Sequence, residues 1–125
     1  MPGRTGMMQK NYSIFNQGDI IVLPVPFSDQ TNTKLRPALV ISNSQFNNKY
    51  PDLILLKITS IGHSLPYDIK LTKKDLIIGD LIKESTINCG FLITANKNII
   101  KQKIGTISKN KLDQTKDRLK LLFEL

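Results

Sequence analysis

The chain has 125 residues, enough for one domain with a modest hydrophobic core but too few for two. Its 18 Lys and Arg outnumber its 10 Asp and Glu and give a net charge of +8, which favours an anionic partner such as nucleic acid or an acidic protein segment. The competing explanation is compositional, because an AT-rich genome enriches Lys, Asn and Ile in all its proteins. The single cysteine, Cys89, excludes an internal disulfide and suits a reducing cytosol. No apolar run is long enough for a membrane span or a signal peptide, so we expect a cytoplasmic protein without a membrane partner.

The N-terminal part of the chain predicts a tail followed by a β-hairpin. Residues 1–16 are expected to be a flexible tail or a cloning remnant, and residues 17–125 a single domain. Residues 20–25 are a β-branched run, and residues 34–42, KLRPALVIS, form a second strand after a polar turn. With the two-residue period of a strand, Arg36 shares a face with Lys34, Ala38 and Val40. The hairpin therefore presents a guanidinium at its mouth.

The remainder of the chain predicts further short strands and one helix. Ser108 is a plausible N-cap, and Leu112, Leu119, Leu122 and Phe123 then recur at helical spacing. We expect this amphipathic helix to cover one opening of a small barrel. The fold class is mostly β, a barrel of five to seven strands closed by the C-terminal helix. Before this helix we expect a loop at 43–50, a strand at 52–60 buried on both faces for most of its length, and a short strand at 67–71. Residues 72–75 are expected to be a single helical turn or a tight connection ending near Gly79. Strands at 81–93, with a bulge or bend at Gly90, and at 99–107 follow.

The common metal and cofactor motifs are missing from the sequence. One Cys and one His cannot fill a zinc site, and the carboxylates form no D-x-D cluster for magnesium. No glycine-rich phosphate loop precedes a helix, and no Ser, His and acid combination occupies a recognisable elbow. An enzyme built from this chain would therefore work without metal or cofactor, using Arg, Thr, Ser, Lys or the lone His63. RNA self-cleavage is one reaction open to such groups, because the ribose 2′-hydroxyl already lies beside the phosphorus.

Four short motifs occur in an order that resembles a known family. GDI at 18–20, PFSD at 26–29, K-x-RPALVIS at 34–42 and SN-x-x-FN at 42–47 are similar to the opening of the MazF/PemK-type toxins, the ribonucleases of bacterial type II toxin–antitoxin pairs. The resemblance implies an SH3-like barrel of the MazF/PemK/CcdB kind that acts as a homodimer. It also implies a metal-independent endoribonuclease that cleaves single-stranded RNA to 2′,3′-cyclic phosphate and 5′-hydroxyl ends and blocks translation and growth. The implied partner is an acidic antitoxin.

The resemblance also indicates site residues. Arg36, in the RP motif, and Thr59, at the end of the third strand, stand at the family's catalytic positions. An arginine fork matches two phosphate oxygens and stays charged, so we assign Arg36 to electrostatic stabilisation and leave the proton acceptor open. Each residue also has a structural interpretation, Arg36 as a surface-strand arginine and Thr59 as a β-former. The expected substrate-binding residues are Lys34, Ser60, His63, Ser28 and Asn47.

The chain departs from the family after Ser85. Family members usually carry C/L-[DE]-Q-x-R-T-x-D there, whereas Gly90, Phe91, Ile93 and Asn96 replace the acid, glutamine, arginine and aspartate in this sequence. In some branches the acid and the arginine contribute to cleavage or substrate binding. The alternative function is therefore a non-catalytic binder on the same barrel, either a nucleic-acid-binding or antitoxin-binding relic or a gyrase poison of the CcdB kind. That poison relies on a C-terminal tryptophan, and this chain has none. Exposed aromatic side chains for stacking an unpaired base are expected among Phe46, Tyr50, Tyr67 and Phe91.

Overall fold

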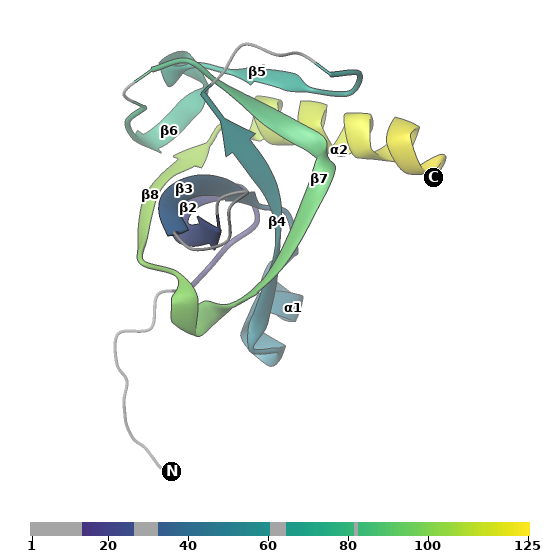
Figure 1. The fold of residues 1–125 in the computed structure, drawn as a ribbon. Helices are drawn as coiled ribbons and strands as arrows, with labels where there is room; N and C mark the ends of the chain where they lie inside the picture. Colours follow the sequence, from purple (N-terminus) through teal and green to yellow (C-terminus); the bar gives the residue numbers. More distant parts are fainter. Residues whose placement is uncertain (1–13, 27–32, 61–64, 82) are drawn as a thin grey trace.

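The computed structural model describes residues 14–26, 33–60, 65–81 and 83–125. It is mostly β with one long C-terminal helix, as the sequence predicts (Figure 1). None of the helices in this described part is long and apolar enough to cross a bilayer. In chain order the elements are β2 (Asp19–Pro26), β3 (Thr33–Val40), α1 (Ser44–Lys49), β4 (Asp52–Thr59), β5 (Ile69–Leu71), the 3₁₀ turn η2 (Lys73–Asp75), β6 (Leu76–Gly79), β7 (Ser85–Asn96), the 3₁₀ turn η3 (Lys97–Ile99), β8 (Gln102–Ile107) and α2 (Lys109–Phe123).

The strands form one curled antiparallel sheet. Its order is β5-β7-β4-β3-β2-β8-β6, so the two edge strands, β5 and β6, are consecutive in the chain. The link from Leu71 to Leu76 spans at most about 18 Å, whereas the edges of a flat sheet of this width would lie about 29 Å apart. The sheet must therefore curl until its edges approach each other. Figure 1 shows the resulting half-barrel, and the seven strands fall within the predicted range.

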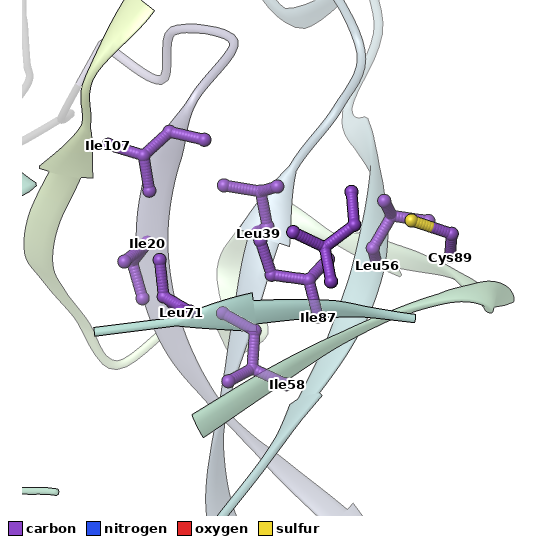
Figure 2. Packing of buried hydrophobic residues seen from close by; sticks show 9 residues of the cluster. Ile20, Leu39, Leu56, Ile58, Leu71, Ile87, Cys89 and Ile107 are labelled. Atoms are coloured by element: carbon purple, nitrogen blue, oxygen red, sulfur yellow. The ribbon is translucent and has the colours of Figure 1, made fainter. Parts of the chain in front are cut away.

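Two hydrophobic clusters lie on opposite faces of the central strands. β4 contributes Leu56 and Ile58 to the first cluster, and Leu53 and Leu55 to the second. The prediction that this strand is buried on both faces is confirmed over most of its length. Figure 2 shows side chains of the first cluster pointing towards one another inside the curl. The first cluster comprises Ile20, Leu39, Leu56, Ile58, Ile69, Leu71, Ile87, Cys89 and Ile107, and the second Phe15, Ile21, Leu23, Ala38, Val40, Leu53, Leu55 and Ala95.

The C-terminal helix begins where the sequence predicts. Ser108 is the N-cap of α2, and its Oγ accepts a hydrogen bond from the Lys111 backbone N–H at 3.1 Å. Leu112 and Leu119 pack against the first cluster, so α2 covers the curled sheet along its N-terminal and middle turns. Phe123, which the helical spacing placed on the same stripe, is 51% exposed. The apolar stripe is therefore buried only up to the part of the helix that overlies the sheet.

Several elements differ from the sequence-based predictions. The strand β6 was not predicted, β7 covers residues 85–96 instead of 81–93, and β8 begins at Gln102 because residues 97–99 form the 3₁₀ turn η3. Residues 43–50 were expected to be a loop, but they contain α1, capped by Asn43, whose Oδ1 accepts from the Phe46 N–H at 2.8 Å. Phe15, expected in the tail, is 8% exposed and belongs to the second cluster. A single aromatic side chain thus extends the packed domain to the N-terminal side of residue 17.

Candidate active site

The face of the sheet that carries the second cluster changes from apolar to polar along β3 and β4. Ala38 of β3, a member of that cluster, faces Lys57 of β4. By the period of two, Arg36 and Thr59 point to the same side as this pair. In an antiparallel ladder, residue numbers fall along one strand as they rise along the other. Extending the register by two residues beyond Ala38 and Lys57 therefore places Arg36 opposite Thr59. Both side chains are half-buried. The register thus brings the two predicted catalytic positions to one place on the sheet.

β2 provides the other neighbour of Arg36. Arg36 is paired with Leu23, which is buried in the second cluster, and Lys34 is paired with Val25. An apolar neighbour excludes water from one side of the guanidinium, and electrostatic interactions strengthen where water is excluded. Lys34 is exposed on the same face as Arg36, closer to the mouth of the hairpin. The β3 strand therefore presents two cations in a row, the inner one partly shielded from solvent.

β7 extends the same face on the other side of β4. Thr59 is paired with Thr86, and Lys57 with Asn88, but Leu56 is paired with Leu92. The register shift leaves residues 89–91 as a bulge at the predicted position of Gly90, and Figure 1 shows the strong bend of β7 midway along its length. Within the bulge Cys89 is buried in the first cluster, while Phe91 is 50% exposed. The bulge therefore directs an aromatic ring outwards beside the polar face.

A pocket of about 470 Å³ lies between this face and the turn at residues 65–68. The Asp68 N–H donates to the Leu65 carbonyl at 3.0 Å, and the Leu65 N–H donates to Asp68 Oδ2 at 2.8 Å. Asn88 Nδ2 donates to the same carboxylate oxygen at 3.2 Å, and Arg118 Nη1 of α2 donates to the Asp68 carbonyl at 3.1 Å. These bonds fix the turn to both β7 and α2. The pocket is lined by Lys57, Thr59, Leu65, Pro66, Asp68, Asn88, Gly90 and Phe91.

Two further features shape the wall of the pocket. Tyr67, in the middle of the turn, has a φ of 75°. This backbone conformation is unfavourable for residues other than glycine, and it persists only where surrounding contacts enforce it. The Lys57 Nζ lies 4.4 Å from the centroid of the Phe91 ring, in a cation–π contact. The wall thus combines a strained, hydrogen-bonded turn with an aromatic ring held by a cation.

The cysteine beside the pocket does not fit a nucleophilic role. Burial raises the pKa of the Cys89 thiol to about 11, although the positive charge of Arg118 acts in the opposite direction. The thiol is therefore protonated at neutral pH, in keeping with its position in the hydrophobic core.

Among the residues described by the structure, no three His, Cys, Asp or Glu side chains form a group that could hold a metal ion.

The predicted substrate-binding residues have different outcomes. Ser60 is exposed directly after Thr59, whereas Ser28 and His63 lie outside the described residues. Asn47 requires a correction, because it is only 1% exposed and its Nδ2 donates to the carbonyls of Phe15 and Ser42, each at 3.0 Å. Its amide holds α1 against the segment that precedes β2, so it has no surface with which to contact RNA.

A family model described as "PemK-like, MazF-like toxin of type II toxin-antitoxin system" matches residues 16–123. The chain belongs to this family. The match includes β3, β4 and β7 and the pocket that β4 and β7 form with the turn at residues 65–68, and it confirms the resemblance found in the sequence motifs. No curated protein matches the chain significantly.

Solved structures share the fold of this PemK/MazF-family chain. An endoribonuclease from a mycobacterial species has a TM-score of 0.72 at 14% identity, over 93% of this chain and 97% of that one. A MazE–MazF structure from Deinococcus radiodurans has a TM-score of 0.70 at 16% identity, over 90% and 99% of the two chains. The toxin MazF-mt6 of Mycobacterium tuberculosis has a TM-score of 0.65 at 16% identity, over 84% and 97%. At these identities the likeness shows the fold.

The structure adds pocket residues that the sequence analysis of this family member missed. Lys57, Asp68 and Asn88 were not singled out, because a lysine in a strand and polar residues beside a turn are common. The only sequence signal near them was Gly90, which indicated an irregular strand. Their proximity follows from the pairing of β4 with β7, which no local pattern specifies.

Proposed function

We propose that the chain is the toxin of a type II toxin–antitoxin pair and that it cleaves single-stranded RNA, including mRNA, without a metal ion. Support comes from the family membership and above all from the β3–β4 register: extended by two residues from its last pair, Ala38 and Lys57, it sets Arg36 opposite Thr59 on one face of the sheet. Solved structures of the same fold include an endoribonuclease from a mycobacterial species. Cleavage of mRNA would block translation and inhibit growth.

The proposed reaction is attack of the ribose 2′-hydroxyl on the adjacent phosphorus, which expels the 5′-oxygen of the next nucleotide. The products are a 2′,3′-cyclic phosphate and a 5′-hydroxyl. The proton that the 2′-hydroxyl loses is balanced by the proton that the leaving 5′-oxygen takes up from water. Arg36 donates two hydrogen bonds to the non-bridging oxygens, whose negative charge grows in the pentavalent transition state. The hydroxyl of Thr59 donates a further hydrogen bond from the facing strand. A guanidinium is not a proton acceptor in proteins, so Arg36 supplies charge and alignment rather than proton transfer.

The proposed partners are an acidic antitoxin and a second copy of the chain. The net charge of +8 would attract an acidic segment as well as RNA. One solved relative is an endoribonuclease in complex with its cognate antitoxin. The edge strand β6 exposes Ile77 and Ile78, at 65% and 64%, an apolar surface that association of two chains would cover.

The test is cleavage of a labelled single-stranded RNA in the presence of EDTA. We expect cleavage whose products carry a 5′-hydroxyl, shown by direct phosphorylation with a polynucleotide kinase. DNA and 2′-O-methyl RNA of the same sequence serve as controls and should stay intact, because neither has the 2′-hydroxyl nucleophile. Cleavage that requires Mg²⁺ would contradict the proposal. Binding of RNA without cleavage would favour the alternative of a non-catalytic relic.

A further inference from the structure

The pocket beside Thr59 has the chemistry of a site for a flat, uncharged ring. Leu65, Pro66 and Phe91 provide apolar surface, and the volume of about 470 Å³ lies in the usual range of small-molecule sites. The carboxylate of Asp68 in the same wall repels phosphate. A phosphate site would gather several cations or backbone N–H groups around the cavity. Lys57 also lines this pocket, but its ammonium group lies over the Phe91 ring.

We propose that this pocket binds one unpaired nucleobase of the RNA, with Phe91 as its stacking surface and Asp68 selecting bases that carry an amino group. The inference rests on the proposed RNA substrate. It assigns a role to Phe91, one of the positions at which the chain departs from its family, and to a turn that the catalytic proposal does not use.

The first argument concerns Phe91. Burial of a large aromatic side chain is energetically favourable, yet the bulge of β7 leaves half of the Phe91 surface exposed to water at the edge of the pocket. Stacking on an aromatic ring is the common way in which proteins hold single-stranded bases. Lys57 lies over the ring and on the same face of β4 as Thr59, two residues and thus about 7 Å away. A base in the pocket and a phosphate at Thr59 would therefore belong to the same or to neighbouring nucleotides.

The second argument concerns Asp68. Both hydrogen bonds to its carboxylate, from the Leu65 N–H and from Asn88 Nδ2, go to Oδ2. No donor from the described part of the chain reaches Oδ1, and Asp68 lines the pocket. An ionised carboxylate only accepts hydrogen bonds, so it pairs with the N4 amino group of cytosine and repels the O4 oxygen that uracil carries at the same ring position.

The third argument is that the wall exists before any ligand arrives. The turn at residues 65–68 is held by reciprocal hydrogen bonds and by Arg118, and it keeps Tyr67 at a φ of 75°. Strained backbone held in this way is concentrated at binding sites. A preformed wall also lowers the entropic cost of ordering a base.

The stacking role is tested by fluorescence anisotropy with 2′-O-methyl oligocytidine, which the wild-type protein cannot cleave by the proposed mechanism. We expect Phe91→Ala to weaken binding about tenfold or more and Phe91→Tyr to bind as the wild type does. Phe123→Ala is the matched control, because Phe123 undergoes the same substitution and is exposed to the same extent, 51% against 50%, but it lies at the end of α2 and does not line the pocket, so its variant should bind as the wild type does. Unchanged binding by Phe91→Ala would overturn the proposal.

Base selection is tested by the ratio of affinities for 2′-O-methyl oligocytidine and oligouridine. We expect the wild type to prefer oligocytidine about fivefold or more, and Asp68→Asn to bring the ratio close to one. The lost negative charge raises both affinities equally, so the ratio isolates base recognition. Thermal melting of Asp68→Asn verifies that the turn is intact. The selectivity is refuted if the wild type shows no preference or if the ratio is the same in the variant.

Two comparisons separate this proposal from its alternatives. If sedimentation shows that Phe91→Ala dissociates a dimer while RNA affinity is unchanged, Phe91 belongs to a protein interface and the nucleobase proposal fails. If the wild type binds oligocytidine through Phe91 but does not cut unmodified RNA, the ribonuclease proposal fails and the nucleobase pocket stands.

Discussion

Ala38 of β3 faces Lys57 of β4, and this pair determines which other side chains of the two strands can meet. Arg36 lies two residues before Ala38 and Thr59 lies two residues after Lys57, so both are on the same face and at the same end of the ladder. The same strand β4 pairs with β7 at Thr59 and Thr86. The site therefore depends on the register of three strands, and shifting any one by a single residue would turn its side chains to the opposite face.

The first prediction concerns the catalytic pair. Arg36→Ala and Thr59→Val should each lower the rate of RNA cleavage about 10²-fold or more, because each removes a donor to the charged transition state. Arg36→Lys should not restore the rate, since an ammonium cannot make the bidentate contact. Initial rates on a labelled single-stranded RNA measure the effect.

Thr86→Val is the matched control for Thr59→Val. Thr86 is the cross-strand partner of Thr59 and undergoes the same substitution, but it lies one strand further from Arg36. We expect its rate to stay within about threefold of the wild type, because it removes no donor facing the guanidinium. Equal losses in the two variants would contradict the assigned role of Thr59.

The second prediction concerns a largely buried ion pair. Lys103 Nζ lies 3.1 Å from Asp19 Oδ2, and the Asp19 side chain is only 3% exposed. Lys103→Met leaves that carboxylate with the neutral donors Thr106 Oγ1 and Asn16 N–H, so the free energy of unfolding should fall by about 2 kcal/mol. Urea unfolding at pH 7 measures it. Lys73→Met, which breaks the exposed pair with Asp80, should change stability by less than about 0.5 kcal/mol. Similar effects in both variants would argue against the buried pair as a source of stability.

The third prediction concerns pH. The pKa of Cys89 is raised from 9.0 to about 11 by burial, so the folded state holds the thiol proton more tightly than the unfolded state. The resulting stabilisation is fully present below pH 9 and is lost as the pH rises towards 11. Between pH 8 and pH 10 the wild type should lose about 1 kcal/mol more stability than Cys89→Ala, measured by urea unfolding. Parallel losses in the two proteins would show that Cys89 is not the titrating group.

The fourth prediction concerns two glycines. A Cβ at Gly79, where φ is +89°, would clash with the Ile104 carbonyl oxygen of β8. Gly79→Ala should therefore lower the free energy of unfolding by at least about 2 kcal/mol. A Cβ at Gly90 would meet no atom within 4 Å, so Gly90→Ala should be neutral or stabilise by up to about 1 kcal/mol. Thermal and urea unfolding distinguish the two, and a tolerant Gly79 would mean that β6 and β8 lie further apart.

The sequence predicted those elements that depend on interactions between residues close together in the chain. The N-cap at Ser108, the turn that became η2 and the bulge at Gly90 follow from hydroxyl capping, turn residues and a glycine in a strand. Asn47 was misassigned for a related reason, because a polar residue in an apparent loop is usually exposed. Its burial depends on Phe15 and Ser42, whose carbonyls it binds, and Phe15 is distant in sequence.

The sequence by itself determined the mostly β fold, the terminal helix, the family and the two residues proposed for catalysis. Alternation, capping and motif order are properties of neighbouring residues, and these can be seen without coordinates. Only the tertiary structure decided that Arg36 and Thr59 share a face and that Lys57, Asp68 and Phe91 enclose a pocket beside them. The physical reason is that strand register and the bulge of β7 are set by packing between distant segments, and both the site and its pocket arise from that pairing.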